Sequence, residues 1–137
     1  MNRLAMFVTL PITVTIMIQG CITEDPEIIW NSYNENILNA PSDNNMIFLI
    51  YFTIPGCSGC HITEEKLFSN ASVITVLSRY TCIKINALRE MDLSKMYNIS
   101  TYPTIIFLKQ NKELLRIKGS ITDAQEFLTE IHGLEEY

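Results

Sequence analysis

The sequence predicts an α/β domain with a central mixed sheet of about four strands flanked by helices. Residues 46–53 form a continuous apolar run, which is typical of a central strand that helices cover on both faces. Strand-like and helix-like segments alternate along the first part of the chain, and a hairpin followed by a helix ends it. This order is that of an α/β sandwich rather than of a helical bundle or an all-β fold.

The first elements follow from periodicity and turn signals. Apolar residues at positions 29, 30, 33 and 37 have helical spacing and predict a helix over 27–38. A Pro-Ser-Asp-Asn-Asn cluster at 41–45 indicates a turn before the central strand. Pro55 and Gly56 break that strand, and a helix is expected to run from the next residues to about Leu67 or Phe68.

The remaining elements alternate in the same way. Ser69 or Asn70 is expected to cap a helix that buries Val73, Val76, Leu77 and Tyr80. A parallel strand is predicted over 82–86, a short helix over 92–97, and an antiparallel pair over 104–108 and 113–118. The last helix is expected to begin at a capping box of Thr122 and Gln125. Its buried stripe would comprise Ala124, Phe127, Leu128 and Ile131.

Length and charge limit the classes of function. The chain has 137 residues, of which 47% are hydrophobic, so one domain with a sizeable core is expected after the N-terminal segment. The formal net charge is −5 and no basic stripe occurs, which argues against nucleic acid as a partner. We expect a monomer.

Residues 1–20 have the pattern of a signal peptide or a membrane anchor. Arg3 is the only charged side chain there, and an apolar stretch follows it. The residues Ile18-Gln19-Gly20-Cys21 resemble a lipobox, in which the peptide is cut before a cysteine that receives lipid. Lipidated Cys21 and an uncleaved anchor therefore remain alternatives, with residues 21–26 as a tether and 27–137 as the domain. Both place the domain outside the cytoplasm, in the periplasm or at the cell surface, and attached to the membrane.

The most informative motif is Cys57-Ser58-Gly59-Cys60, which lies between the apolar strand and a helix. A cysteine at a helix N-terminus meets unpaired backbone N–H groups and the positive end of the helix dipole, which favour the thiolate. We therefore expect Cys57 to attack a substrate disulfide and Cys60, one turn later, to resolve the mixed disulfide. The alternative is a static structural disulfide.

The chain resembles the thioredoxin-like superfamily over residues 46–132. The resemblance rests on the strand–CxxC–helix junction, on Lys84-Ile85-Asn86, on residues 97–104 with their Pro-Thr pair, and on Gly119 before the last helix. It implies a cis peptide bond before Pro103, contact of Tyr102 and Pro103 with a bound peptide, and a modulating role for Lys84. It also implies protein thiols or disulfides as partners and no cofactor besides the redox-active cysteine pair.

A narrower likeness covers about twenty residues after the motif. Cys60-His61, then Glu64 or Glu65, then the run from Phe68 to Val73 are similar to thioredoxin-like domains that include the exported C-terminal domain of transmembrane thiol–disulfide interchange transporters. It favours a reductant or electron relay over a strong oxidant. The chain departs from thioredoxins proper at Gly56, where they have tryptophan, and at Tyr51, where they have a buried aspartate that assists proton transfer from the second cysteine. We therefore expect Gly56 and His61 to modulate the pair.

Alternative functions use the same residues. Cys57 to His61 also matches a c-type haem attachment site with His61 as axial ligand, and the two cysteines with His61 are candidate ligands for copper(I). A redox-inactive thioredoxin-fold binding module is the third alternative. We favour the oxidoreductase and expect no metal site. The remaining cysteine of the domain, Cys82, falls in a predicted strand and is expected to be a buried, inert thiol.

Overall fold

The computed structural model describes residues 26–34 and 46–136 of the chain. The leader expected over 1–20, the lipidation candidate Cys21 and most of the tether lie outside these ranges. No helix in the described ranges is long and apolar enough to span a bilayer. The elements in chain order are β1 (Asn31–Ser32), β2 (Ile47–Thr53), α2 (Ser58–Thr63), the π-helical turn η1 (Glu64–Phe68), α3 (Ala71–Leu77), β3 (Thr81–Asn86), α4 (Met91–Met96), β4 (Thr104–Lys109), β5 (Lys112–Lys118), α5 (Ala124–Ile131) and the 3-10 helix η2 (His132–Glu136).

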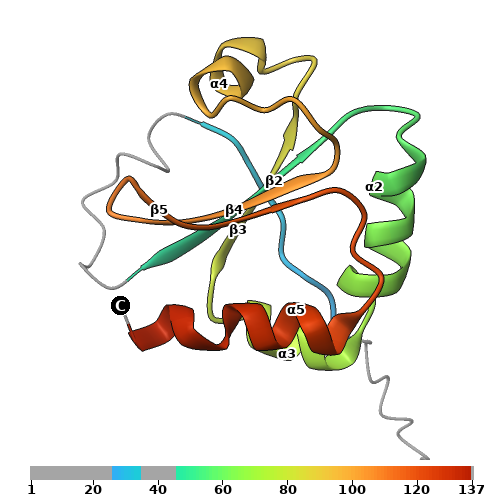
Figure 1. Cartoon of the computed structure of the whole chain (residues 1–137), viewed down its shortest axis with the longest axis vertical. Helices are drawn as coiled ribbons and strands as arrows, with labels where there is room; N and C mark the ends of the chain where they lie inside the picture. The colour runs from blue at the N-terminus through green and yellow to red at the C-terminus, as the bar shows by residue number, and fades with distance from the viewer. Residues whose placement is uncertain (1–25, 35–45, 137) are drawn as a thin grey trace, which may run out of the picture.

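The strands form one mixed sheet in the order β1-β3-β2-β4-β5. β2 pairs in parallel with β3 and antiparallel with β4, and β5 pairs antiparallel with β4. The class of fold predicted from the sequence is therefore confirmed, with β1 as an additional edge strand. Figure 1 shows α2 beside the sheet, α3 and α5 along one end, and α4 at the opposite end.

The central strand β2 divides the core into two layers because successive side chains point to opposite faces. Leu49 and Tyr51 pack with α2, α3 and α5, whereas Ile50 and Phe52 pack toward Leu93 of α4. All six residues from Ile47 to Phe52 are buried, as expected for a strand covered on both faces. The polypeptide leaves β2 at the carboxyl end of the sheet and enters α2 there.

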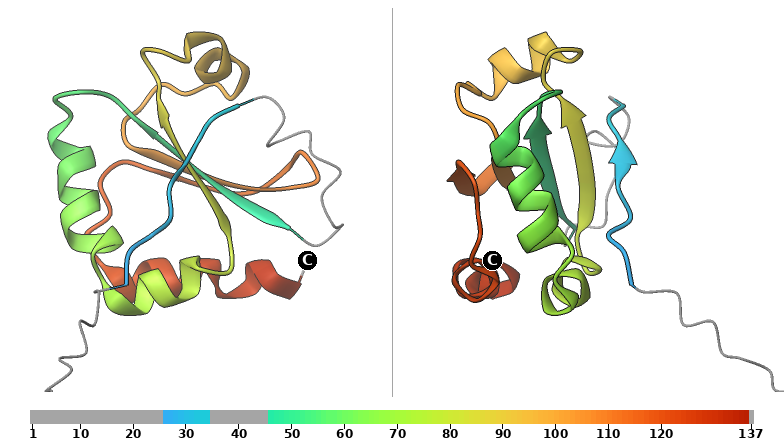
Figure 2. Two further views of the ribbon diagram at one scale, coloured as in Figure 1. Left: turned by 180° about the vertical axis from the view of Figure 1, so that it is seen from behind. Right: turned by 90° about the vertical axis from the view of Figure 1, so that its right-hand side faces the viewer.

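The helix predicted over 27–38 is wrong for the part that the structure describes. Residues 26–34 are extended, and β1 adds in parallel to the free edge of β3, on the side away from β2 (Figure 2). Ile28 and Trp30 pack against the core while Ile29 is 84% exposed, so the side chains alternate with the period of a strand. Backbone pairing with the open edge of β3 outweighs the helical spacing of the apolar residues.

The later elements agree with the sequence to within one or two residues. Asn70 is the N-cap of α3, and its side chain accepts hydrogen bonds from the backbone N–H groups of Ser72 and Val73. The predicted capping box at Thr122 is wrong, because Asp123 is the N-cap of α5 and accepts from the N–H groups of Gln125 and Glu126 at 2.8 and 3.0 Å. A carboxylate at this position satisfies two helix donors at once.

Candidate functional site

The cysteine motif lies at the junction between β2 and α2. Gly56 has a φ of +73°, in the left-handed region that favours glycine, and it turns the chain from the strand into the helix. A tryptophan, which thioredoxins carry here, would be strained in this conformation. Cys57 is the N-cap of α2, and its Sγ accepts a hydrogen bond from the backbone N–H of Cys60 at 3.1 Å.

The two cysteines form a disulfide with a Cα–Cα separation of 5.2 Å. Cys57 is partly exposed, whereas Cys60 is 3% exposed. An incoming group therefore reaches the sulfur of Cys57 before that of Cys60. Attack by Cys57 and resolution by Cys60 need such an asymmetry, and these two roles stay predictions.

The peptide bond between Tyr102 and Pro103 is cis, as the resemblance implied. Gly59 faces this turn: a Cβ added to Gly59 would lie 3.3 Å from Pro103 Cδ and only 2.5 Å from Ser120 Oγ. The backbone N–H of Gly119 donates to the Pro103 carbonyl oxygen at 2.8 Å. The structure thus places the cysteine motif and the turns at 102–103 and 119–120 next to each other.

Buried Thr63 forms hydrogen bonds with both the cysteine motif and the segment after Ser120. Its hydroxyl donates to the Gly59 carbonyl oxygen at 3.0 Å and accepts from the backbone N–H of Ile121 at 3.1 Å. Neither Thr63 nor Ser120 belongs to the cysteine or proline motifs, so no motif in the sequence indicated them. The sequence offered one indication of Thr63: it lies in the predicted helix three residues after the second cysteine, where a threonine hydroxyl can bond a backbone carbonyl of the preceding turn.

Tyr51 lies behind Cys60 and is fully buried. Its hydroxyl donates toward two acceptors, the Cys60 carbonyl oxygen at 3.2 Å and Glu64 Oε1 at 3.3 Å. Burial raises the pKa of the Tyr51 phenol far above its ordinary value, and the nearby Glu64 carboxylate raises it further. The phenol therefore stays protonated at neutral pH and acts as a hydrogen-bond donor.

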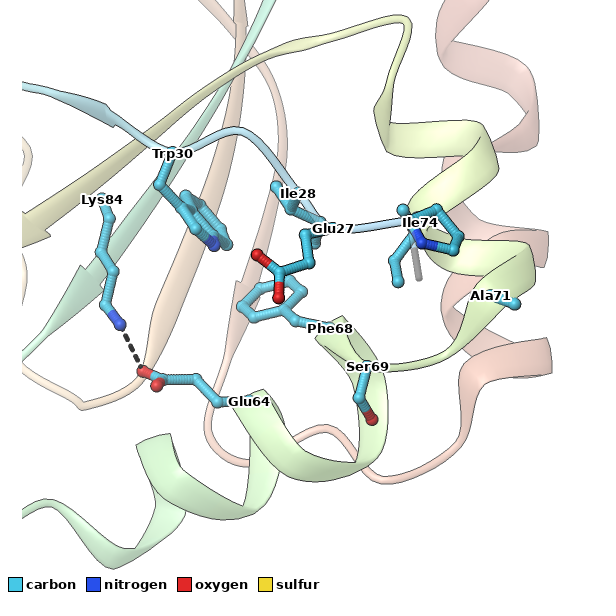
Figure 3. Close-up of a pocket in the computed structure, with 10 residues that line it drawn as sticks. Glu27, Ile28, Trp30, Glu64, Phe68, Ser69, Ala71, Ile74 and Lys84 are labelled. Carbon is cyan, nitrogen blue, oxygen red and sulfur yellow. Dashed lines mark ion pairs between the residues drawn. The ribbon is translucent and has the colours of Figure 1, made fainter. Parts of the chain in front are cut away.

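Lys84, on β3, contacts both Glu64 and Tyr51. Its Nζ lies 3.0 Å from Glu64 Oε1 and 5.8 Å from the centre of the Tyr51 ring. The ion pair bridges the strand and the helix at the edge of a hollow that also contains Trp30 and Phe68 (Figure 3). Lys84 therefore contacts a carboxylate beside the cysteine pair.

The side chain of His61 is exposed and lies near Glu65. Its Nε2 lies 4.0 Å from Glu65 Oε2, and its side chain is 80% exposed. It nevertheless lines the open cleft around the disulfide, which has a volume of about 380 Å³ and also includes Gly56, Cys57, Cys60 and Glu64. Gly56, His61 and Glu64 thus line the same cleft as the pair, and the modulating role expected of Gly56 and His61 stays a prediction.

The other chemistry-bearing groups are separate from this site. Cys82 is a free, buried thiol, as expected, and burial raises its pKa to about 12. Over residues 26–34 and 46–136, no three His, Cys, Asp or Glu side chains are grouped so that they could hold a metal ion.

The chain matches the family model of the thioredoxin-like domain over residues 33–134. Among solved structures it resembles a thioredoxin from Thermus thermophilus, with a TM-score of 0.64 at 22% identity over 77% of this chain and 86% of that one. A thioredoxin from Nicotiana alata gives a TM-score of 0.62 at 19% identity, covering 80% of this chain and 95% of the other. The fold and the cysteine junction define a thioredoxin-like protein, and the chain belongs to the thioredoxin-like domain family.

Two relatives are similar in sequence as well. Thioredoxin H8 of Arabidopsis thaliana is 33% identical over 89 residues, which are 65% of this chain and 58% of the relative. The thiol:disulfide interchange protein DsbD of Campylobacter jejuni is 29% identical over 92 residues, which are 64% of this chain but 16% of the relative. The chain thus spans less than two thirds of the length of either relative.

Proposed function

We propose that this chain is a thiol–disulfide oxidoreductase that reduces protein disulfides, or relays electrons to them, outside the cytoplasm. The observation that carries the proposal is the pairing of a partly exposed Cys57 with a buried Cys60 at the start of α2, next to the cis bond before Pro103. The family match and the relatives that are a thioredoxin and a thiol:disulfide interchange protein support it.

In the proposed reaction the reduced protein supplies two electrons. The Cys57 thiolate attacks one sulfur of a substrate disulfide, forms a mixed disulfide and releases the other substrate sulfur as a thiolate. Cys60 then loses its proton and attacks Cys57 Sγ, so that the Cys57–Cys60 bond forms and the second substrate thiolate leaves. A dithiol donor restores the reduced state. We expect Tyr102 and Pro103, whose turn lies next to Gly59 of the cysteine motif, to contact the substrate peptide.

Insulin reduction tests this activity. The wild-type chain should reduce insulin disulfides in the presence of a dithiol donor, and Cys57→Ser should abolish the reaction. Equal rates for the two proteins would refute the proposal and favour a redox-inactive binding module. The measured reduction potential tests the direction of electron flow, because a value near −120 mV, where strong exported oxidants lie, would contradict a reductant.

Membrane attachment is the second part of the proposal. It is supported by Arg3, by the apolar stretch that follows it, and by the lipobox-like residues before Cys21. We propose lipidation of Cys21, with residues 21–26 as the tether. Mass spectrometry of the membrane fraction should find a lipid-modified N-terminal cysteine, and an intact chain beginning at Met1 would instead identify an uncleaved anchor.

The proposed reaction uses cysteines from a single copy of the chain, so the proposal of a monomer needs no group from a second copy.

A further inference from the structure

The carboxylate that thioredoxins place behind the second cysteine is missing from its usual position. Fully buried Tyr51 occupies that position in β2, and its hydroxyl contacts the Cys60 carbonyl oxygen. The mixed disulfide is resolved only after the thiol of Cys60 has lost its proton. Since Cys60 is 3% exposed, bulk solvent has little access to it. A base within the protein would therefore assist the loss of this proton.

Glu64 brings a carboxylate to this place from a different element. It lies one helical turn after Cys60, where α2 ends and the π-helical turn η1 begins. Glu64 Oε1 lies 3.3 Å from the Tyr51 hydroxyl and 3.0 Å from Lys84 Nζ. These two partners, from β2 and β3, hold the carboxylate in one position, and π-helical turns often occur at functional sites.

The same carboxylate has access to both the disulfide and solvent. Glu64 lines the disulfide cleft together with Cys57 and Cys60. It also lines the adjoining hollow of about 500 Å³ that contains Trp30 and Phe68 (Figure 3). A proton taken from the cleft can thus be passed on to water through the hollow.

We propose that Glu64 is the base that accepts the proton of the Cys60 thiol when Cys60 resolves the mixed disulfide. This rests on the proposed function. In the step, the Cys60 S–H proton moves to the Glu64 carboxylate, directly or through one water, while Cys60 Sγ bonds to Cys57 Sγ. The bond between Cys57 and the substrate sulfur breaks, and the substrate leaves as a thiolate that is protonated by solvent. No further oxidant or reductant is involved.

Other titratable groups around the cleft fit this role less well. His61 is 80% exposed and turned toward Glu65. Glu65 is exposed and pairs with Lys66 at 3.0 Å. Glu27 lines the hollow next to Phe68 but does not line the disulfide cleft (Figure 3). Lys84 and Tyr51 are hydrogen-bond donors to Glu64 rather than proton acceptors.

The test follows the mixed disulfide in the reduced full chain. Glutathione disulfide is mixed with the protein, the reaction is quenched with acid at successive times, and mass spectrometry with peptide mapping measures the adduct on Cys57. For Glu64→Gln we expect the adduct to persist at least about 10-fold longer than in the wild type near neutral pH, while its rate of formation stays the same. Raising the pH should shorten its lifetime as hydroxide replaces the missing base. Glu64→Asp should restore most of the rate.

Glu65→Gln is the matched control, since it removes a carboxylate from the next position of the same helix and should leave the adduct lifetime unchanged. A wild-type lifetime in Glu64→Gln would overturn the role of Glu64, as would equal slowing of adduct formation and decay. If the wild-type chain itself forms no adduct and does not reduce insulin, the proposed function fails. The two failures are therefore distinguishable.

Discussion

Replacement of Tyr51 by phenylalanine isolates the contribution of one buried hydroxyl. The hydroxyl lies 3.2 Å from the Cys60 carbonyl oxygen and 3.3 Å from Glu64 Oε1, both longer than a strong O–H···O bond. After its loss, the Cys60 carbonyl still accepts the backbone N–H of Glu64, and Glu64 keeps its ion pair with Lys84. No acceptor is left without a partner, so we expect the free energy of unfolding to fall by about 1 kcal/mol.

The aromatic ring of Tyr51 contributes more to the free energy of unfolding than its hydroxyl does. Trp30 and Phe68 pack against Tyr51 with ring centroids 5.6 and 5.0 Å away. Phenylalanine preserves these contacts, whereas Tyr51→Ala removes a fully buried ring and should cost about 3–5 kcal/mol. The two variants therefore separate the hydroxyl from the packing.

Urea unfolding of the oxidised protein measures both variants. Trp30 is the only tryptophan of the chain, and its fluorescence reports on the contact with Tyr51, with far-UV circular dichroism as the second probe. A double-mutant cycle of Tyr51→Phe with Glu64→Gln should give a coupling of about 0.5–1 kcal/mol. Unchanged stability of Tyr51→Phe, together with zero coupling, would show that the hydroxyl does not bind Glu64 and would refute this reasoning.

Three further predictions concern the surroundings of the site. Gly59→Ala should destabilise the oxidised protein, since its Cβ would lie 2.5 Å from Ser120 Oγ, and adding Ser120→Ala should restore most of the lost thermal stability; no recovery would locate the strain elsewhere. Asp123→Ala should lower the free energy of unfolding by about 1 kcal/mol while Thr122→Ala changes it little, and the reverse order would contradict the assignment of the N-cap. Burial raises the pKa of Cys82 to about 12, so its thiol stays protonated through mildly alkaline pH. Iodoacetamide at about pH 9 should leave Cys82 unmodified in the folded protein and alkylate it in urea; rapid labelling of the folded chain would contradict its burial.

The sequence predicted the parts of this fold that depend on local patterns. The apolar run of β2, the turn at Gly56 and the amphipathic α5 each carry their signal within a few residues. The prediction of an N-terminal helix was wrong because the strand β1 forms only by pairing with the open edge of β3, which is distant in sequence. In a strand Ile29 and Trp30 face opposite sides, so their apolar character alone favoured a helix, and the tertiary pairing with β3 decided the conformation.

The site followed the same division. Cys57, Cys60 and Pro103 belong to motifs that are visible in the sequence, and Glu64 appeared there only as one of two glutamates in the narrower likeness, without a role. Thr63 and Ser120 act through contacts between elements. Tyr51 was recognised as a departure from thioredoxins, but its partner was not apparent. The ion pair of Lys84 with Glu64 joins positions 20 residues apart on a strand and a helix, and no local pattern indicates it.

Trapping of the mixed disulfide tests the central claim most directly. In Cys60→Ser the resolving thiol is absent, so a reduced chain mixed with a peptide disulfide should accumulate a stable adduct that maps to Cys57. Cys57→Ser should form no such adduct, because Cys60 is buried behind it. An adduct on Cys60 in the second variant, or none in the first, would contradict the assignment of Cys57 as the attacking thiolate.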